Sequence, residues 1–134
     1  MAWSDYEEGI KFSWNFSFCE SDLVTFSVLS GDYSPLHLNS SFAKSKGFDA
    51  PLIHGLLLST QMSRLIGQEL PDNNAILTGL QIDFMQPCFS GDKLRFESEI
   101  TLKSDSTSSL EFKCFISKQG IDLCKGRVNA LWRA

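Results

Sequence analysis

The stretch LLLSTQMSRLIGQE, residues 56–69, is the one long helix that the sequence predicts. Its first turn, residues 56–58, consists of leucine alone, which predicts burial on every side. The apolar face continues at Met62, Leu65, Ile66 and Leu70. A Pro-Asp-Asn-Asn turn at 71–74 ends the helix. A helix of this kind is best buried if a single sheet curls around it.

The rest of the second half is predicted to supply that sheet. Four strand-like runs lie at 75–85, 93–103, 110–118 and 121–131. The short separations between them require antiparallel neighbours. A further strand is predicted at 12–18, where aromatic residues alternate with Ser and Asn. The predicted fold class is therefore α+β, with an antiparallel sheet wrapped around a long central helix.

Between the first strand and the long helix, the sequence predicts only short helical pieces. Apolar residues at three-residue spacing predict a helix over 23–29, with Ser21 or Asp22 as its N-cap. A glycine can then take the positive φ of the helix exit. A second short helix is expected at 41–46, again closed by a glycine.

Composition excludes several classes of protein. The 134 residues carry a net charge of −4 with a pI near 5.1, and no basic stripe predicts nucleic-acid binding. No apolar run is long enough to span a membrane, and the N-terminal residues do not resemble a signal peptide. Four scattered cysteines without a Cys-x-x-Cys motif predict reduced thiols. We therefore expect a cytoplasmic protein.

Both histidines of the chain lie between residues 29 and 55, and Asp32 stands five residues before His37. Pro35 excludes a regular element over 32–39, so a turn there could bring the two side chains together. A carboxylate and an imidazole that share one water can deprotonate it and return a proton. The same spacing also fits a plain turn in which the aspartate is only a cap.

The dipeptide His54-Gly55 enters the long helix. The first N–H groups of a helix have no internal partner, and glycine lets a carbonyl oxygen approach closely, as a developing enolate needs. The alternatives are tight packing at Gly55 and a local hydrogen bond for His54. Ser59 and Ser63 are hydroxyls in an otherwise apolar segment. Ser63 could reach towards Asp32 or bond a carbonyl one turn back.

Other chemistries lack their motifs. A Gly-x-Ser-x-Gly elbow is absent, which argues against a serine hydrolase. A glycine-rich phosphate loop is absent as well. His37 and His54 have no third ligand clustered with them in the sequence, so we expect neither a metal nor another cofactor.

Taken together, SGDYSPLH (30–37) and PLIHG (51–55) resemble the signature of the MaoC-like (R)-specific enoyl-CoA hydratases, which have the hotdog fold. The resemblance extends over nearly the whole chain and includes the long helix. It implies that residues 1–134 form a single MaoC-like hotdog domain. Two positions depart from the family pattern: Ser34 stands where asparagine is common, and Asn39 where aspartate is common.

The resemblance implies a hydro-lyase of fatty acid metabolism that adds water reversibly and syn to a trans-2-enoyl thioester, giving the (R)-3-hydroxyacyl product. Asp32 would be the main base, and His37 its partner in proton delivery. The Gly55 N–H would polarise the thioester carbonyl, with Ser63 as a supporting hydroxyl near the aspartate. The residues expected to bind substrate are Pro51, His54, Leu56, Ser59, Met62, Leu65 and Phe84.

The family also implies a homodimer whose substrate is an acyl-CoA or an acyl-carrier-protein thioester. Three alternatives stay open: a 3-hydroxyacyl-carrier-protein dehydratase, a hotdog thioesterase, and a noncatalytic acyl-binding module. The intact pair Asp32 and His37 argues against the last two.

Overall fold

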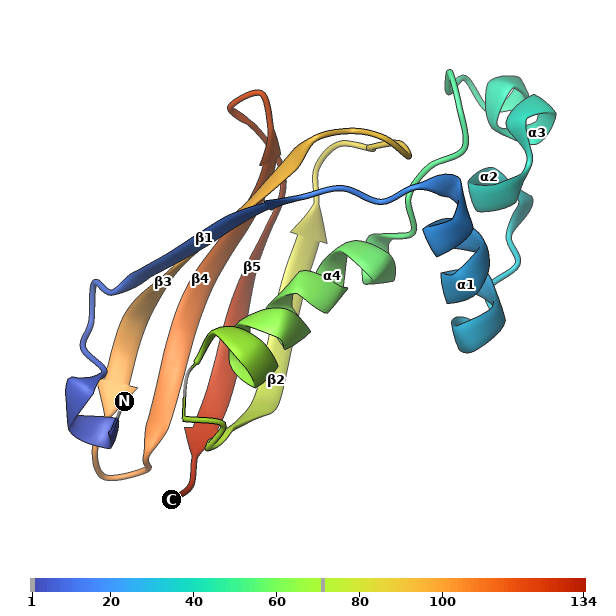
Figure 1. The fold of residues 1–134 in the computed structure, drawn as a ribbon. Coiled ribbons are helices and arrows are strands. Elements are labelled where there is room, and N and C mark those ends of the chain that lie inside the picture. Colours follow the sequence, from blue (N-terminus) through green and yellow to red (C-terminus); the bar gives the residue numbers. More distant parts are fainter. Residues whose placement is uncertain (1, 71) are drawn as a thin grey trace.

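The computed structural model describes residues 2–70 and 72–134, whose elements are arranged as in Figure 1. Five strands form one antiparallel sheet in the order β1-β3-β4-β5-β2. The strands are β1 (Lys11–Phe16), β2 (Ala75–Phe84), β3 (Leu94–Ser104), β4 (Ser109–Lys118) and β5 (Ile121–Trp132). The α+β class and all five predicted strands are confirmed, with ends that differ by no more than two residues.

The predicted pairing of β2 is wrong. Its short separation from β3 suggested antiparallel neighbours, but β2 pairs with β5, and β3 lies between β1 and β4. The nine residues of the 85–93 segment are enough to carry the chain across the end of the sheet. There the Met85 N–H donates to the Leu123 carbonyl at 2.8 Å. β2 is consequently an edge strand, opposite to β1.

The long helix α4 (Gly55–Arg64) lies along one face of the sheet and ends in a π-helical turn, η2 (Leu65–Glu69). Leu57 and Leu58 are buried, as predicted. Leu56 is not, because 64% of it is exposed. The prediction of burial on every side is therefore wrong for this chain, since the sheet covers only one side of the helix (Figure 1).

The core lies between α4 and the sheet. The inward positions of β3 and β4 alternate with exposed ones and include Phe96, Ile100, Phe112 and Ile116. Gly126 on β5 permits the close packing of this layer, because a Cβ there would lie 2.6 Å from the Gln81 carbonyl oxygen and 3.4 Å from Cε of Met62. A short 3₁₀ turn that the sequence did not predict, η1 (Trp3–Asp5), packs Trp3 against Trp132 with ring centroids 5.6 Å apart.

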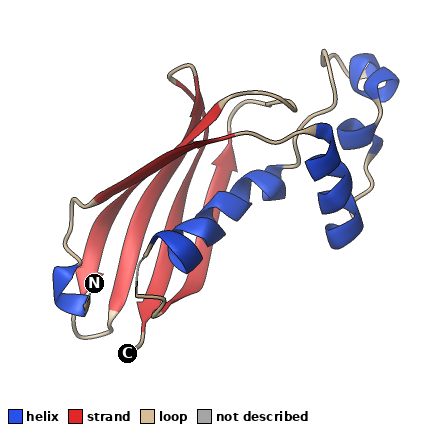
Figure 2. Ribbon diagram, in the orientation of Figure 1, coloured by secondary structure: helices blue, strands red, loops and turns tan. Residues whose placement is uncertain are grey.

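Three short helices stand beyond one end of the sheet: α1 (Glu20–Ser30), α2 (Pro35–Leu38) and α3 (Ser40–Ser45) (Figure 2). We call residues 17–54 the helical extension, and the sheet with α4 the body. The predicted caps of the first helix are wrong, because α1 begins after Cys19. Asp22 instead accepts the Cys19 N–H at 2.8 Å.

The helix α2 corrects a second expectation, since no regular element was predicted around Pro35. Ser34 does take an extended conformation, with ψ 128°. Pro35 then occupies the first helical position, where a missing N–H costs no hydrogen bond. The Ser34 hydroxyl accepts the Leu36 N–H at 3.4 Å and caps the turn. The proline therefore starts a helical turn that carries His37.

All four cysteines are free thiols. Burial raises the pKa of Cys88 and Cys114 to about 11 and that of Cys124 to about 12, so these three thiols are poor nucleophiles. Cys19 is exposed. Among the helices of the residues described, none is long and apolar enough to cross a bilayer.

Candidate active site

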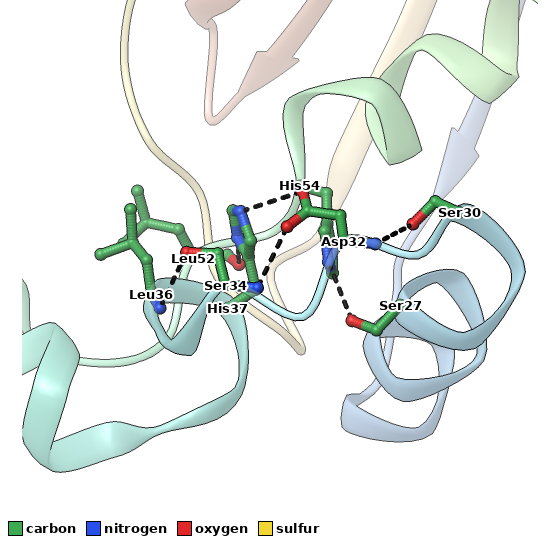
Figure 3. Close-up of polar contacts among 8 residues, drawn as sticks. All are labelled: Ser27, Ser30, Asp32, Ser34, Leu36, His37, Leu52 and His54. Carbon is green, nitrogen blue, oxygen red and sulfur yellow. Dashed lines mark hydrogen bonds and ion pairs between the residues drawn. The ribbon is translucent and has the colours of Figure 1, made fainter.

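Asp32 and His37 face each other across the loop between α1 and α2 (Figure 3). Oδ2 of Asp32 lies 3.9 Å from Nε2 of His37. This gap is too long for a hydrogen bond, but one water could bond to both atoms across it. The Asp32 side chain is 49% exposed and that of His37 is 15% exposed, so solvent reaches the pair.

Backbone groups hold both side chains in place. The Ser34 N–H donates to Oδ1 of Asp32 at 3.1 Å, which leaves Oδ2 as the oxygen that faces His37. Nδ1 of His37 lies 2.8 Å from the Leu52 carbonyl oxygen. A carbonyl can only accept, so Nδ1 carries a proton. In the neutral imidazole, Nε2 is therefore the basic nitrogen, and it points at the aspartate.

His54 lies against one face of the His37 ring. The two imidazole rings stack with centroids 3.9 Å apart and an angle of 22° between their planes. Only 1% of His54 is exposed, and its Nε2 lies 3.1 Å from Oγ of Ser27. Burial lowers the pKa of His54, and a charge on His37 would lower it further, while Asp32 acts in the opposite direction. The net effect favours the neutral imidazole at His54.

Gly55 begins α4 directly after His54. As the first residue of the helix, it has no acceptor for its N–H within the helix, and no other backbone acceptor is found for it among the described residues. A Cβ on Gly55 would lie 2.9 Å from Cζ of Phe84, so only glycine allows this ring its position. Sequence reasoning left tight packing and carbonyl binding as alternatives, and the packing requirement holds.

A cavity of about 340 Å³ opens between these groups. His37, Gly55 and Phe84 bound it, and its other walls include Phe48, Leu58 and Met85. Phe84 is 48% exposed and stands at its side. A second cavity, of about 280 Å³, reaches His37 from the side of Pro51 and Leu23. His37 therefore lies between two hollows, one of them mostly apolar.

The sequence argued against a metal because no third ligand is clustered with His37 and His54. In the structure, Asp32 lies close to both. One ligand atom each of Asp32, His37 and His54 lies within 4.8 Å of the others. Imidazole binds a metal through a lone pair in its ring plane, at about 2.0 Å for zinc. The centroids of the two stacked rings are 3.9 Å apart, and their planes are tilted by 22°. Over a bond of about 2.0 Å, this tilt brings the two lone pairs closer by less than about 1 Å, so they cannot meet at one ion. The cluster suits proton transfer better than coordination of one ion.

The structure does not bring every predicted site residue to this place. Ser63 is exposed and lies eight residues along α4 from Gly55, or about 12 Å at 1.5 Å per residue. No hydrogen bond joins its hydroxyl to Asp32 among the described residues. The hydroxyl of Ser59 donates to the Leu56 carbonyl at 2.6 Å. Met62 and Leu65 are wholly buried in the core, and Leu56 points away from it.

Sequence reasoning missed two groups, Ser27 and the Leu52 carbonyl. Ser27 follows the buried Leu23 at the four-residue spacing that shares one helix face, which is a signal that the sequence contains. The predicted apolar face of this helix included Leu29 instead, and 83% of that residue is exposed. The Leu52 carbonyl has no signal in the sequence, because every residue carries one.

Comparison with known proteins identifies relatives of this chain. An (R)-specific enoyl-CoA hydratase from Aeromonas caviae is 37% identical over 101 residues, which are 75% of this chain and 75% of that protein. A mitochondrial 3-hydroxyacyl-[acyl-carrier-protein] dehydratase from Arabidopsis thaliana is 26% identical over 118 residues, or 85% of this chain and 70% of that one.

Solved structures agree as well. The (R)-hydratase of A. caviae involved in PHA biosynthesis superimposes with a TM-score of 0.91 at 31% identity, covering 96% of this chain and 98% of that one. An unliganded R-hydratase from Pseudomonas aeruginosa reaches 0.89 at 27% identity, covering 97% and 84%. The fold is accordingly the hotdog fold. The family model described as MaoC like domain matches residues 4–113, and the chain belongs to that family.

Proposed function

We propose that this protein adds water reversibly to trans-2-enoyl thioesters of coenzyme A and forms the (R)-3-hydroxyacyl thioester. The observation that carries the proposal is the 3.9 Å gap between Oδ2 of Asp32 and Nε2 of His37, next to the free N–H of Gly55. A largely apolar cavity of about 340 Å³ is lined by His37 and Gly55 and suits an acyl chain. Relatives named as enoyl-CoA hydratases support the same reaction.

The two side chains are arranged to orient a water molecule. Oδ2 of the Asp32 carboxylate and Nε2 of the neutral His37 are both acceptors, so a water between them donates one proton to each. Its oxygen lone pair then faces away from the pair, towards C3 of the substrate. We assign Asp32 as the main base and His37 as its partner in proton delivery.

Hydration needs an acceptor for the charge that develops at the other end of the enoyl group. When the water oxygen bonds to C3, electrons move through C2 towards the thioester carbonyl oxygen. The Gly55 N–H, at the positive end of α4, is available to stabilise that enolate. The pair of Asp32 and His37 then returns the proton taken from water to C2 on the same face. Water is consumed, and the pair regains its starting state.

We further propose that the protein acts as a homodimer. β2 is an edge strand, and its exposed apolar side chains include Ile76, Leu77, Leu80 and Phe84. Leu56 and Ser63 lie seven residues apart on α4 and so share its exposed side. A second copy that covers this side would bury the apolar edge. The predicted contribution of Ser63 would then be made across the interface.

The experiment is hydration of crotonyl-CoA, followed through loss of the enoyl absorbance, with chiral analysis of the product. We expect the (R)-alcohol from the wild type. Asp32→Asn should lower kcat by about 10²–10⁴-fold, because the amide oxygen is a poor base. Light scattering during gel filtration should give both proteins the mass of a dimer of the 15.0 kDa chain.

Two outcomes contradict the proposal. Release of free thiol without hydration would identify a thioesterase. Hydration at an unchanged rate in both Asp32→Asn and His37→Ala would remove this pair from the mechanism. Glu97→Gln is a matched control, because it neutralises an exposed carboxylate on β3 whose ion pair is with Arg95. Its kcat should equal that of the wild type.

A further inference from the structure

His54 has an unusual environment for the residue that precedes a helix. It occupies the N-cap position of α4, yet its side chain caps nothing there and turns back to α1. Its Nδ1 is buried and makes no hydrogen bond of ordinary geometry among the described residues, although the backbone of Asp32 lies near enough to raise the pKa of His54. A buried polar atom without a partner costs stability. An apolar residue would avoid that cost, so a role for the imidazole is indicated.

Ser27 is the anchor of this imidazole. It is a buried polar residue of α1, with 1% exposed, and its hydroxyl meets Nε2 of His54 at 3.1 Å. The ring of Phe26, its neighbour, packs edge to face with that of His54, with centroids 4.8 Å apart and an interplanar angle of 66°. α1 therefore restrains the imidazole through both a hydrogen bond and an aromatic contact.

A face of the His54 ring is the surface on which His37 lies. The Leu52 carbonyl holds His37 from within the ring plane, through Nδ1. The stack on His54, at 3.9 Å, holds it from above the plane. These two restraints act in different directions, and together they leave Nε2 directed at Asp32 (Figure 3).

We propose that Ser27 and His54 form a positioning pair that fixes the imidazole of His37 in the orientation needed for catalysis. This inference rests on the proposed function, because it assigns His37 a proton to move. The titratable groups that face His54 are His37 and Asp32, while its neighbours on α1, Phe26 and Ser27, carry no charge. A neutral His54 supports the stack without repelling a proton that arrives on His37.

The segment 52–55 joins this pair to the rest of the site. Within four residues it supplies the Leu52 carbonyl, the His54 ring and the Gly55 N–H. Movement of His54 would therefore disturb the acid–base pair and the carbonyl donor together. Misplacement by about 1 Å can cost about 10²-fold in rate. The anchor from Ser27 is thus expected to matter for kcat although Ser27 is remote from the reacting atoms.

The test compares Ser27→Ala with His54→Phe and His54→Leu. Ser27→Ala should lower kcat about 10-fold and leave KM within about twofold, because substrate binding is unaffected while the transition state is misaligned. His54→Phe keeps a ring for the stack, and His54→Leu does not. Both lose the bond to Ser27, so kcat should fall further in His54→Leu, to about 10²-fold below wild type. Ser98→Ala removes another buried hydroxyl, on β3, and should leave kcat unchanged.

A second readout needs no substrate. The chain has only two histidines, so imidazole ¹⁵N spectra at pH 8 can be assigned with one variant. The wild type should show His37 as the single tautomer with a proton on Nδ1. Ser27→Ala should broaden or shift the His37 signals, and Ser98→Ala should not.

Unchanged His37 spectra in Ser27→Ala would overturn the proposal, and so would equal kcat values for His54→Phe and His54→Leu. A wild type that hydrates no enoyl thioester would refute the proposed function alone, because the spectra assess the positioning pair independently.

Discussion

The body and the helical extension of this molecule are built in opposite ways. The body buries large side chains between α4 and the sheet, and the wholly buried ones include Phe96, Phe112, Met62 and Leu65. The three helices of the extension bury only Leu23, Ser27 and Ala43. Yet Asp32 and His37 both lie in the extension. Stability and chemistry are thus encoded in different segments, which meet at His54 and Gly55.

The largest effect on stability is expected from the body. Phe112→Ala on β4 should lower the free energy of unfolding by about 3–5 kcal/mol, because it removes a wholly buried ring and leaves a cavity. Urea unfolding followed by tryptophan fluorescence measures this loss. The folded fraction should keep its kcat, since the ring lies outside both cavities that adjoin His37.

Phe42→Ala is the matched control in the extension. Phe42 on α3 is 37% exposed, so its loss should cost less than about 1 kcal/mol. Similar destabilisation by the two substitutions would show that the extension is as tightly packed as the body, which would contradict the comparison.

The second prediction concerns the junction between the two regions. In Gly55→Ala, the new Cβ would lie 2.9 Å from Cζ of Phe84, and the ring would have to move. We expect kcat/KM to fall about 10-fold, because the N–H of residue 55 and one wall of the cavity shift together. Steady-state kinetics with crotonyl-CoA measure the change. Stability should change little, because alanine favours the helix more than glycine does.

The double variant Gly55→Ala/Phe84→Leu decides whether the ring is the cause. Leucine is shorter than phenylalanine and leaves room for the new methyl group. The double variant should recover most of the lost kcat/KM. If it is no better than Gly55→Ala, the effect does not arise from contact with Phe84.

The strands and the long helix could be predicted because their periodicity is a local property of the sequence. The position of β2 at the sheet edge could not, since pairing depends on where the 85–93 segment carries the chain. The juxtaposition of Asp32, His37 and Gly55 agrees with the family motif. The stack of His54 on His37 was beyond sequence reasoning, because it joins positions 17 residues apart through contacts with a third segment.

The exposure of Leu56 has a similar cause. An all-leucine turn predicts burial on every side, but one sheet can cover only one side of a helix. The sequence pattern describes an apolar surface, and within this chain the sheet covers only one side of it. Ser63 lies on the same exposed side of α4 as Leu56.

The smallest expected effect is a pH dependence that arises at the junction. Burial lowers the pKa of His54 in the folded state below its ordinary value of 6.5. Between the folded pKa and pH 6.5, the unfolded chain therefore binds a proton at His54 that the folded chain does not bind. Stability from this source is fully present above pH 6.5 and is lost as the pH falls towards the folded pKa. The slope cannot exceed about 1.4 kcal/mol per pH unit.

His54→Phe isolates this contribution, because the other titratable groups are common to both proteins. Urea unfolding at pH 7.5, 6.5 and 5.5 should show the wild type losing more stability than the variant on acidification. Parallel curves would mean that His54 binds its proton equally in both states, and hence that the imidazole is not desolvated in solution. The expected result, a smaller loss of stability in the variant on acidification, would show that protonation of the buried His54 limits the stability of the protein below neutral pH. The same imidazole would then both restrain His37 and make the fold sensitive to acid.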